Sequence, residues 1–319
     1  MIIDFRSRPP FDNSFRYLTT EVNKASYRII SGFETAESVE AFSMVKYFEE
    51  MRDAGIDKGL ITGRRSCHGF IDEIPGKENE NNDAVKEILE KYPDKFIGAY
   101  GIDPTDGEKA IKWIEQYVVN GAFSAVLIEP DLAKIPMSVD DKRVLPFYDY
   151  CEANNIPVLL AFGELNYQSM RHMSPTALDN ICEMFGNLKI IIFHGGWPYV
   201  SEVLWIAFNR ENFYISPDYT MLPAWAGYEG YINAANTFMQ DKIIFGSSYP
   251  FVAMGPMKQY YESVLRPEVV PKVLGANAMR ALNMELSENC PPVAPHVTRP
   301  PVPREISDLD LWDEYEKQY

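Results

Sequence analysis

Short apolar runs alternate with helix-forming segments along most of this 319-residue chain. The apolar runs lie at 1–5, 58–62, 96–100, 124–128, 157–160, 189–193, 213–216 and 242–245. Helix-forming sequence lies at 36–54, 80–92, 107–120, 140–155, 175–186, 198–210, 228–240, 256–265 and 268–283. Continuous apolar strands are typical of a parallel sheet with both faces buried, and eight strand–helix units favour a closed barrel over an open sheet. We therefore predict an α/β fold, a single (β/α)8 TIM barrel over residues 1–284.

Two segments fall outside this alternation. Residues 11–35 are polar with scattered aromatic side chains, and we expect a long functional loop there. Residues 285–319 are proline-rich and then acidic and aromatic, so they form either a disordered tail or an extended C-terminal arm across a neighbouring subunit. Apolar side chains near the end, such as Leu311 and Trp312, favour the arm and with it a homodimer or larger homo-oligomer.

The overall composition limits the partners and the compartment. The formal net charge of −16 argues against nucleic acid and anionic membranes as partners. We find neither a signal-peptide pattern nor an apolar run long enough to cross a membrane. The four cysteines lack metal-type or disulfide-type spacing, so we expect reduced thiols and a cytoplasmic protein.

The opening stretch poses an electrostatic problem. Arg6 and Arg8 follow a buried strand, and in an extended chain they share one face while Ser7 points to the other. Two guanidinium groups at the end of a buried strand are costly unless they meet anions. The second strand is also followed by two arginines, Arg64 and Arg65.

Barrel enzymes carry their chemistry where strands end, and these four arginines lie at such ends. They predict a site for a small carboxylate, such as a dicarboxylate, because arginine binds carboxylates through two parallel hydrogen bonds. The alternative is structural salt bridging, with Glu129, Asp4 or a loop acid as the partner.

Polar residues after the later strands add candidate catalytic groups. His194 precedes a Gly195-Gly196-Trp197 turn and is a candidate general acid or base, or else a neutral histidine bonded to a carbonyl. Ser248 follows the last strand and should lie near the first, where substrate binding is favoured over nucleophilic attack because a nucleophilic serine needs a base within reach.

Four segments resemble the amidohydrolase superfamily: 2–4, 193–198, 212–218 and 244–251. The most similar branch contains aminocarboxymuconate semialdehyde decarboxylase, aromatic-acid decarboxylases and pyrone dicarboxylate lactonase. The resemblance runs from residue 1 to about 283, which makes residues 1–284 an amidohydrolase-like barrel and leaves 285–319 uncovered.

The departures from the family concern its metal site. The family's first strand ends in two metal-binding histidines, where this chain has Arg6 and Arg8. The histidine after the fifth strand is replaced by Phe162, and the aspartate after the eighth by Ser248, so only His194 remains. Arginine has no lone pair for a metal and repels a divalent cation. We therefore predict no metal and no cofactor.

The resemblance and the residues together suggest a metal-independent hydrolase of a small carboxylated compound, such as a lactone or ester. Arg6 and Arg8 would bind the anion in place of the metal, with His194 and Asp218 as catalytic residues. The expected substrate-binding residues are Arg64, Arg65, Glu129, Trp197, Ser248 and Tyr249. One alternative is a decarboxylase of a small aromatic or unsaturated acid. Another is an inactive barrel that binds a ligand or acts as a scaffold.

Overall fold

A curled parallel sheet forms the centre of the molecule. In the computed structural model, which describes residues 1–11, 13–65, 80–163, 170–286 and 290–293, seven strands pair in sequence order. They are β1 (Ile3–Asp4), β2 (Lys58–Thr62), β3 (Phe96–Ile102), β4 (Ala125–Ile128), β5 (Val158–Ala161), β6 (Ile190–Phe193) and β7 (Phe213–Ile215). Every neighbouring pair is parallel. The sequence prediction of a parallel α/β sheet is therefore confirmed.

The predicted eighth strand is not a regular strand. Residues 242–245 lie between β7 and β1, where Ile244 N–H donates to the Ile215 carbonyl (2.8 Å) and Phe5 N–H donates to the Phe245 carbonyl (3.0 Å). Ile243 makes only an isolated bridge with Ile215. The ladder stops because the amide of Phe245 turns away and donates to the Val273 carbonyl (2.9 Å). The prediction of eight full strands was wrong at this position, and a short bridging segment lies between the edges of the seven-stranded sheet.

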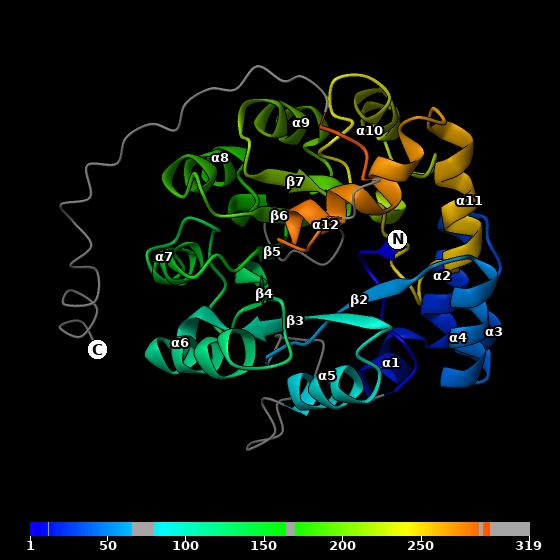
Figure 1. Cartoon of the computed structure of the whole chain (residues 1–319), viewed down its shortest axis with the longest axis horizontal. Coiled ribbons are helices and arrows are strands. Elements are labelled where there is room, and N and C mark those ends of the chain that lie inside the picture. The colour runs from blue at the N-terminus through cyan, green and yellow to red at the C-terminus, as the bar shows by residue number, and fades with distance from the viewer. Residues whose placement is uncertain (12, 66–79, 164–169, 287–289, 294–319) are drawn as a thin grey trace.

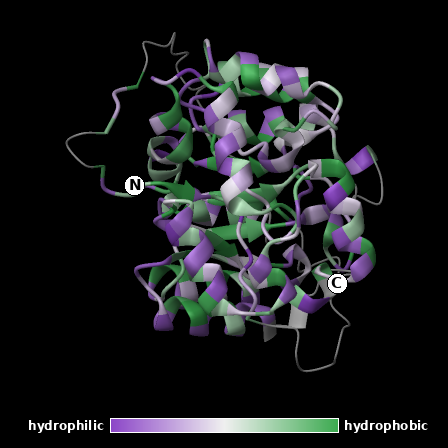
Figure 2. Cartoon of the chain, turned by 90° about the vertical axis from the view of Figure 1, so that its right-hand side faces the viewer, coloured by the Kyte–Doolittle hydropathy of each residue, from purple (hydrophilic) through white to green (hydrophobic). Residues whose placement is uncertain are grey.

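Helices surround the strands (Figure 1). They are α1 (Asn13–Leu18), α2 (Glu21–Ser31), α3 (Glu37–Glu40), α4 (Met44–Asp53), α5 (Glu80–Lys91), α6 (Glu108–Ile114), α7 (Leu145–Ala153), α8 (Pro175–Met184), α9 (Val200–Asn209), α10 (Tyr228–Ala235), α11 (Met254–Val264) and α12 (Asn277–Ala281). Figure 2 shows the hydrophobic strands inside and hydrophilic residues along the outer helices.

Alternate residues of each strand belong to two separate cores. Leu127, Leu159 and Ile191 lie in an inner cluster that includes Ala278 and Met279 of α12. Their sequence neighbours on the same strands lie in the outer cluster between sheet and helices. This division follows from the two-residue period of a strand. The inner cluster fills the sheet's interior with packed side chains, as in a TIM barrel.

Residues 11–35 are not the irregular loop that we expected. They form α1 and α2, because Thr20 caps the start of α2 by accepting the Asn23 N–H (3.3 Å) and Gly32 ends it in the left-handed conformation. Capping of this kind satisfies backbone groups that a loop would leave to water. No residue of α2 is buried in the described structure.

The predicted helix over 36–54 is divided into α3 and α4. Phe42 adopts a positive φ of 47°, and Ser43 then caps α4 through its hydroxyl, which accepts the Lys46 N–H (3.4 Å). Serine at this position favours a new helix start over continuation.

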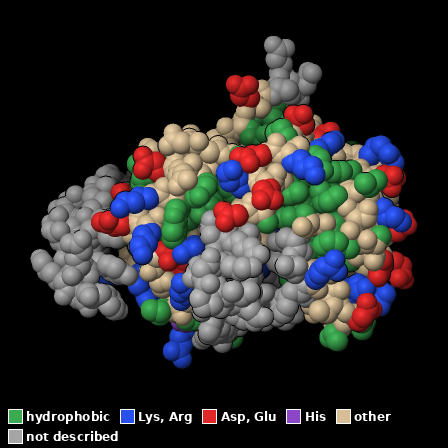
Figure 3. Space-filling model, turned by 90° about the horizontal axis from the view of Figure 1, so that it is seen from below, with side chains coloured by type: hydrophobic (Ala, Val, Ile, Leu, Met, Phe, Trp, Pro, Cys, Tyr) green, Lys and Arg blue, Asp and Glu red, His purple; other side chains and the backbone are tan. Residues whose placement is uncertain are grey.

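The surface of the described chain agrees with a charged globular exterior. Figure 3 shows acidic and basic side chains interspersed with separate hydrophobic patches on the face seen from below. No helix within the described ranges is long and apolar enough to cross a membrane. Most of the predicted C-terminal arm, residues 294–319, lies outside the described residues.

Candidate active site

Four of the predicted site residues lie at the ends of neighbouring strands, and all four are buried. Arg6 follows β1, His194 follows β6, Asp218 follows β7 and Ser248 follows the bridging segment at 242–245. Their exposed fractions are 2%, 1%, 0% and 0%. In a parallel sheet these strand ends meet at one edge, so residues far apart in the sequence come together there.

Arg6, His194 and Asp218 form a continuous polar array. Nη2 of Arg6 lies 3.1 Å from Nε2 of His194, and Oδ2 of Asp218 lies 2.9 Å from Nδ1 on the other side of the ring. The same oxygen accepts the backbone N–H of His194 (3.2 Å). Arginine only donates, so Nε2 must accept, and the proton of a neutral His194 is on Nδ1. Nδ1 and Oδ2 are close enough to interact electrostatically, although the oxygen lies off the N–H direction.

The turn after β6 explains the two glycines. His194 and Gly195 both have positive φ values, 59° and 61°. A Cβ on Gly195 would lie 2.4 Å from Oη of Tyr231, which donates a hydrogen bond to the Gly195 carbonyl (2.9 Å). The absence of a side chain at Gly195 therefore serves packing within the protein, and the N–H of Gly195 donates to the Ser216 carbonyl (3.1 Å).

Aromatic rings flank the arginines that follow β1. The guanidinium of Arg6 lies 4.2 Å from the centre of the Phe193 ring, a cation–π contact that compensates part of the cost of burial. The guanidinium of Arg8 lies 5.9 Å from the Phe251 ring. Ser7 turns the other way and bonds to Tyr47 Oη (2.6 Å), as strand alternation predicts.

Glu129, which follows β4, has a strongly cationic environment. It forms an ion pair with Arg64 (2.7 Å). Burial raises the pKa of Glu129, but the nearby positive charges outweigh burial and hold it below its ordinary value. Those charges are Arg64, Arg6 and Arg8. Arg64 therefore forms the structural salt bridge that we gave as the alternative to substrate binding, and Glu129 is one of the partners that we named for it.

Asp4 is a site residue whose role sequence reasoning missed. Its Oδ2 accepts the Ser247 hydroxyl (2.6 Å) and its Oδ1 accepts the Ser247 N–H (2.7 Å) and the Arg6 N–H (3.2 Å). Burial raises the pKa of Asp4 to about 6, although the bonds from Ser247 oppose the shift. An acid between Ile3 and Phe5 in a buried strand was the available signal. Asp4 binds Ser247, whereas the Ser248 hydroxyl makes no hydrogen bond within the described part of the chain.

Three predicted substrate-binding residues are engaged by other parts of the protein. Arg65 pairs with Asp106 and lies 4.1 Å from the Trp113 ring of α6. The Tyr249 hydroxyl bonds to Ser38. Trp197 donates to the Ala226 carbonyl (3.1 Å) and packs edge-on against Trp225, 5.0 Å away. These contacts assign all three side chains a packing role in this structure.

The donor set at these strand ends does not fit a divalent metal. Arg6 occupies Nε2 of His194, the nitrogen that faces the site, and a guanidinium cannot coordinate a cation. Within the described ranges, no three histidine, cysteine or acidic residues are grouped so as to hold a metal ion. A catalytic zinc needs at least three such ligands.

A curled parallel sheet with buried polar side chains at its strand ends is typical of TIM-barrel enzymes. The family model described as amidohydrolase matches residues 37–284. The chain belongs to this family, and the resemblance drawn from its motifs is confirmed.

Solved structures give the same result for the fold. An uncharacterized TIM-barrel protein from Bordetella bronchiseptica is 31% identical, with a TM-score of 0.78 over 88% of this chain and 98% of that one. 5-Carboxyvanillate decarboxylase from Sphingomonas paucimobilis is 17% identical, with a TM-score of 0.63 over 89% of this chain and 99% of that one. 2,6-Dihydroxybenzoate decarboxylase from Rhizobium is 15% identical, with a TM-score of 0.60 over 88% of this chain and 98% of that one. Curated protein sequences give no match.

Proposed function

We propose that this chain is an enzyme that decarboxylates a small aromatic or unsaturated acid without a metal ion. The observation that carries the proposal is the buried Arg6–His194–Asp218 array, which places a cation and a proton-transfer group side by side. The decarboxylases of similar fold named above act on aromatic acids, and this likeness favours decarboxylation over our first expectation of a lactone hydrolase.

The positive charge of the site suits a carboxylated substrate. Arg6, Arg8 and Arg64 lie near the carboxylate of Glu129, and the rings of Phe193 and Phe251 lie beside two of these arginines. A flat anion can therefore lie against aromatic surface while arginine binds its oxygens. Arg6 and Arg8 supply the positive charge that a metal supplies elsewhere in the family.

A hydroxyl group next to the carboxylate of the substrate allows a balanced reaction at His194. A substrate anion attracts Arg6 and frees Nε2, which takes the hydroxyl proton while Asp218 stabilises the imidazolium. The ring carbon that bears the carboxylate then takes this proton from Nε2. The carbon–carboxylate bond breaks, its electron pair returns to the ring, and carbon dioxide leaves. Arginine stabilises the negative charge on the ring oxygen throughout.

Hydrolysis of a lactone or ester is the second candidate, favoured by the same His194–Asp218 contact. A histidine oriented by an aspartate is a common way to activate water, and Arg6 would then polarise the carbonyl. The two reactions differ in product, since only decarboxylation releases carbon dioxide.

The test is a panel of carboxyl-labelled hydroxybenzoates, dicarboxylates and lactones, incubated with the full chain. We expect labelled carbon dioxide from an aromatic acid, and a loss of about 10²–10⁴-fold in kcat for His194→Asn. Arg143→Gln, which changes a surface arginine paired with Asp141, should retain activity. Incorporation of ¹⁸O from water into a ring-opened lactone would favour the hydrolase. Binding without turnover, unaffected by His194→Asn, would support an inactive barrel and reject both reactions.

A further inference from the structure

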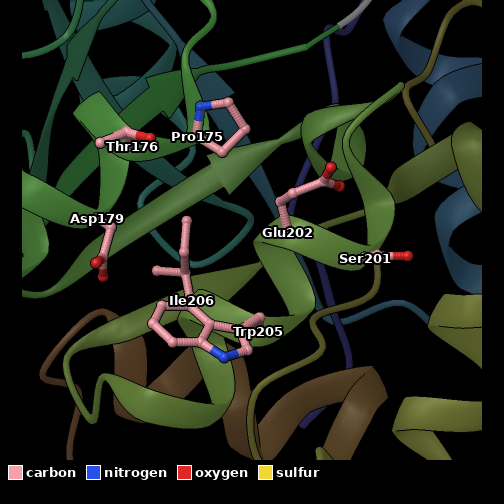
Figure 4. Close-up of a pocket in the computed structure, with 7 residues that line it drawn as sticks. All are labelled: Pro175, Thr176, Asp179, Ser201, Glu202, Trp205 and Ile206. Carbon is pink, nitrogen blue, oxygen red and sulfur yellow. The ribbon is translucent and has the colours of Figure 1, made fainter.

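A groove of about 440 Å³ lies on the outer wall of the molecule between α8 and α9, away from the catalytic array. Pro175 and Asp179 of α8 face Glu202, Trp205 and Ile206 of α9 across it (Figure 4). The Trp205 side chain is 55% exposed. A large exposed ring beside a groove suits a binding surface, because tryptophan contributes much apolar area when a ligand covers it and is enriched among the residues that dominate binding.

The chemistry of the groove favours a rigid apolar ligand with a positive charge. Trp205, Pro175 and Ile206 provide apolar surface, and the face of a tryptophan ring attracts cations. Asp179 is already paired with Arg210 (2.8 Å), whereas Glu202 is exposed and has no ion pair within the described ranges. Proline-rich segments in the polyproline II conformation bind aromatic grooves in this way, with little loss of entropy.

The chain itself contains such a ligand. Residues 299–304 read Arg-Pro-Pro-Val-Pro-Arg, with a positive charge at each end of a proline-rich core. This segment lies outside the described residues, and its composition complements both the ring of Trp205 and the carboxylate of Glu202.

Contacts within the described chain connect the start of the tail to a residue that lines this groove. The Pro291 carbonyl accepts from Arg280, and Arg280 lies 3.5 Å from Asp241. The next residue, Lys242, donates to the carbonyl of Arg210 (3.2 Å), and Arg210 pairs with Asp179 on the groove wall. A short series of contacts thus leads from residue 291 to the groove.

The tail has a considerable reach beyond Pro291, and the last part of the path is short. Arg210 follows the last turn of α9, and the five residues from there to Trp205 correspond to about 7.5 Å of helix axis. Eight residues, the number from 291 to 299, would span about 25 Å if they adopted polyproline II geometry.

We propose that residues 299–304 bind in the α8–α9 groove of their own chain, with the prolines on Trp205 and an arginine beside Glu202. This binding fixes the C-terminal tail to the wall of the barrel, and it is independent of the reaction proposed above. We assign the bound segment to the same chain because the contacts described above connect Pro291 to Asp179 on the groove wall.

Limited trypsin digestion of the full chain tests the proposal, since Arg304 precedes Glu305 and is a cleavable site, whereas Arg299 precedes proline. Bound tail is protected, so Trp205→Ala should speed cleavage after Arg304 by about tenfold if cleavage follows the unbound population. Glu202→Gln should speed it as well. Phe208→Ala is the matched control, because Phe208 is also exposed on α9 (40%) but does not line the groove. Equal cleavage rates for all these variants and the wild type would overturn the proposal.

A cysteine pair then identifies the source of the segment. With Cys290→Ser as background, Thr176→Cys on the groove and Val302→Cys on the tail should form an intrachain disulfide on mild oxidation, detected by peptide mass spectrometry. Disulfides only between chains would reject binding within one chain and assign the groove to the tail of a second copy. Unchanged urea unfolding of Trp205→Ala would show that the change in cleavage is not caused by loss of the fold.

Discussion

Asp4 makes the stability of this protein depend on pH in an unusual direction. Burial raises its pKa from 3.8 to about 6, so the folded state retains a proton that the unfolded state has lost between these values. Stability therefore falls as pH rises through this window and levels off above pH 6. A shift of about two pKa units corresponds to about 3 kcal/mol, at 1.36 kcal/mol per unit.

Asp4→Asn isolates this effect, because an amide keeps the shape and accepts the same backbone N–H groups without the charge. From the two pKa values, we expect the free energy of unfolding of the variant to gain about 2 kcal/mol on the wild type between pH 4.5 and pH 8. Urea unfolding at several pH values measures this difference in the free energy of unfolding between Asp4→Asn and the wild type. Asp53→Asn, at an aspartate whose side chain is 69% exposed, is the control and should show a much smaller change. A gap between Asp4→Asn and the wild type that does not change with pH, or that shrinks towards pH 8, would refute the reasoning.

Three further predictions concern buried charge, packing and metal. Arg64→Met should destabilise the fold by about 3–5 kcal/mol, because it breaks a buried ion pair and removes the guanidinium 2.7 Å from the Glu129 carboxylate. In denaturant titrations, Arg64→Met combined with Glu129→Leu should recover much of this loss, and equal losses for the single and the double variant would argue against the ion pair. Gly195→Ala should lower the free energy of unfolding by about 1–3 kcal/mol more than Gly107→Ala does. Both glycines have positive φ, but of the two only Gly195 has atoms within 4 Å of an added Cβ. Similar melting temperatures for the two variants would contradict the packing role of Gly195. Elemental mass spectrometry of the purified protein should find well under one zinc or manganese per chain, and chelators should leave activity unchanged; stoichiometric metal lost together with activity would reject the metal-free site.

The regular part of the fold was predictable because its signal is local. Runs such as 190–193 are apolar on both faces, which is typical of strands buried in a parallel sheet, and the bounds of β2 were predicted to the residue. Residues 242–245 have the same composition as a strand. Their irregular structure depends on the Val273 carbonyl, which captures the Phe245 amide from a distant part of the chain. Tertiary competition of this kind leaves no trace in a local pattern.

The members of the site were easier to predict than their pairing. Strand ends indicated Arg6, His194 and Asp218, and the structure places all three in contact. Sequence could not decide whether an arginine faces a substrate or a protein carboxylate, because both need the same residue. Arg64 pairs with Glu129 and Arg65 with Asp106, choices fixed by loop geometry. The α2 helix was missed because residues 21–31 are mostly polar and lie in a segment rich in polar residues, and none of its residues is buried.

The backbone at His194, Asp218 and Ser248 has a consequence for laboratory evolution. All three have positive φ values, 59°, 45° and 60°, where a side chain costs about 1 kcal/mol or more and glycine costs almost nothing. At His194 and Asp218 the buried contacts described above oppose a change to glycine. The Ser248 hydroxyl makes no hydrogen bond within the described residues, so a selection for heat resistance alone would favour glycine there first. An early gain in melting temperature would then remove a hydroxyl from the end of a strand next to the catalytic array, so thermostable descendants of this chain should be screened for turnover from the first round.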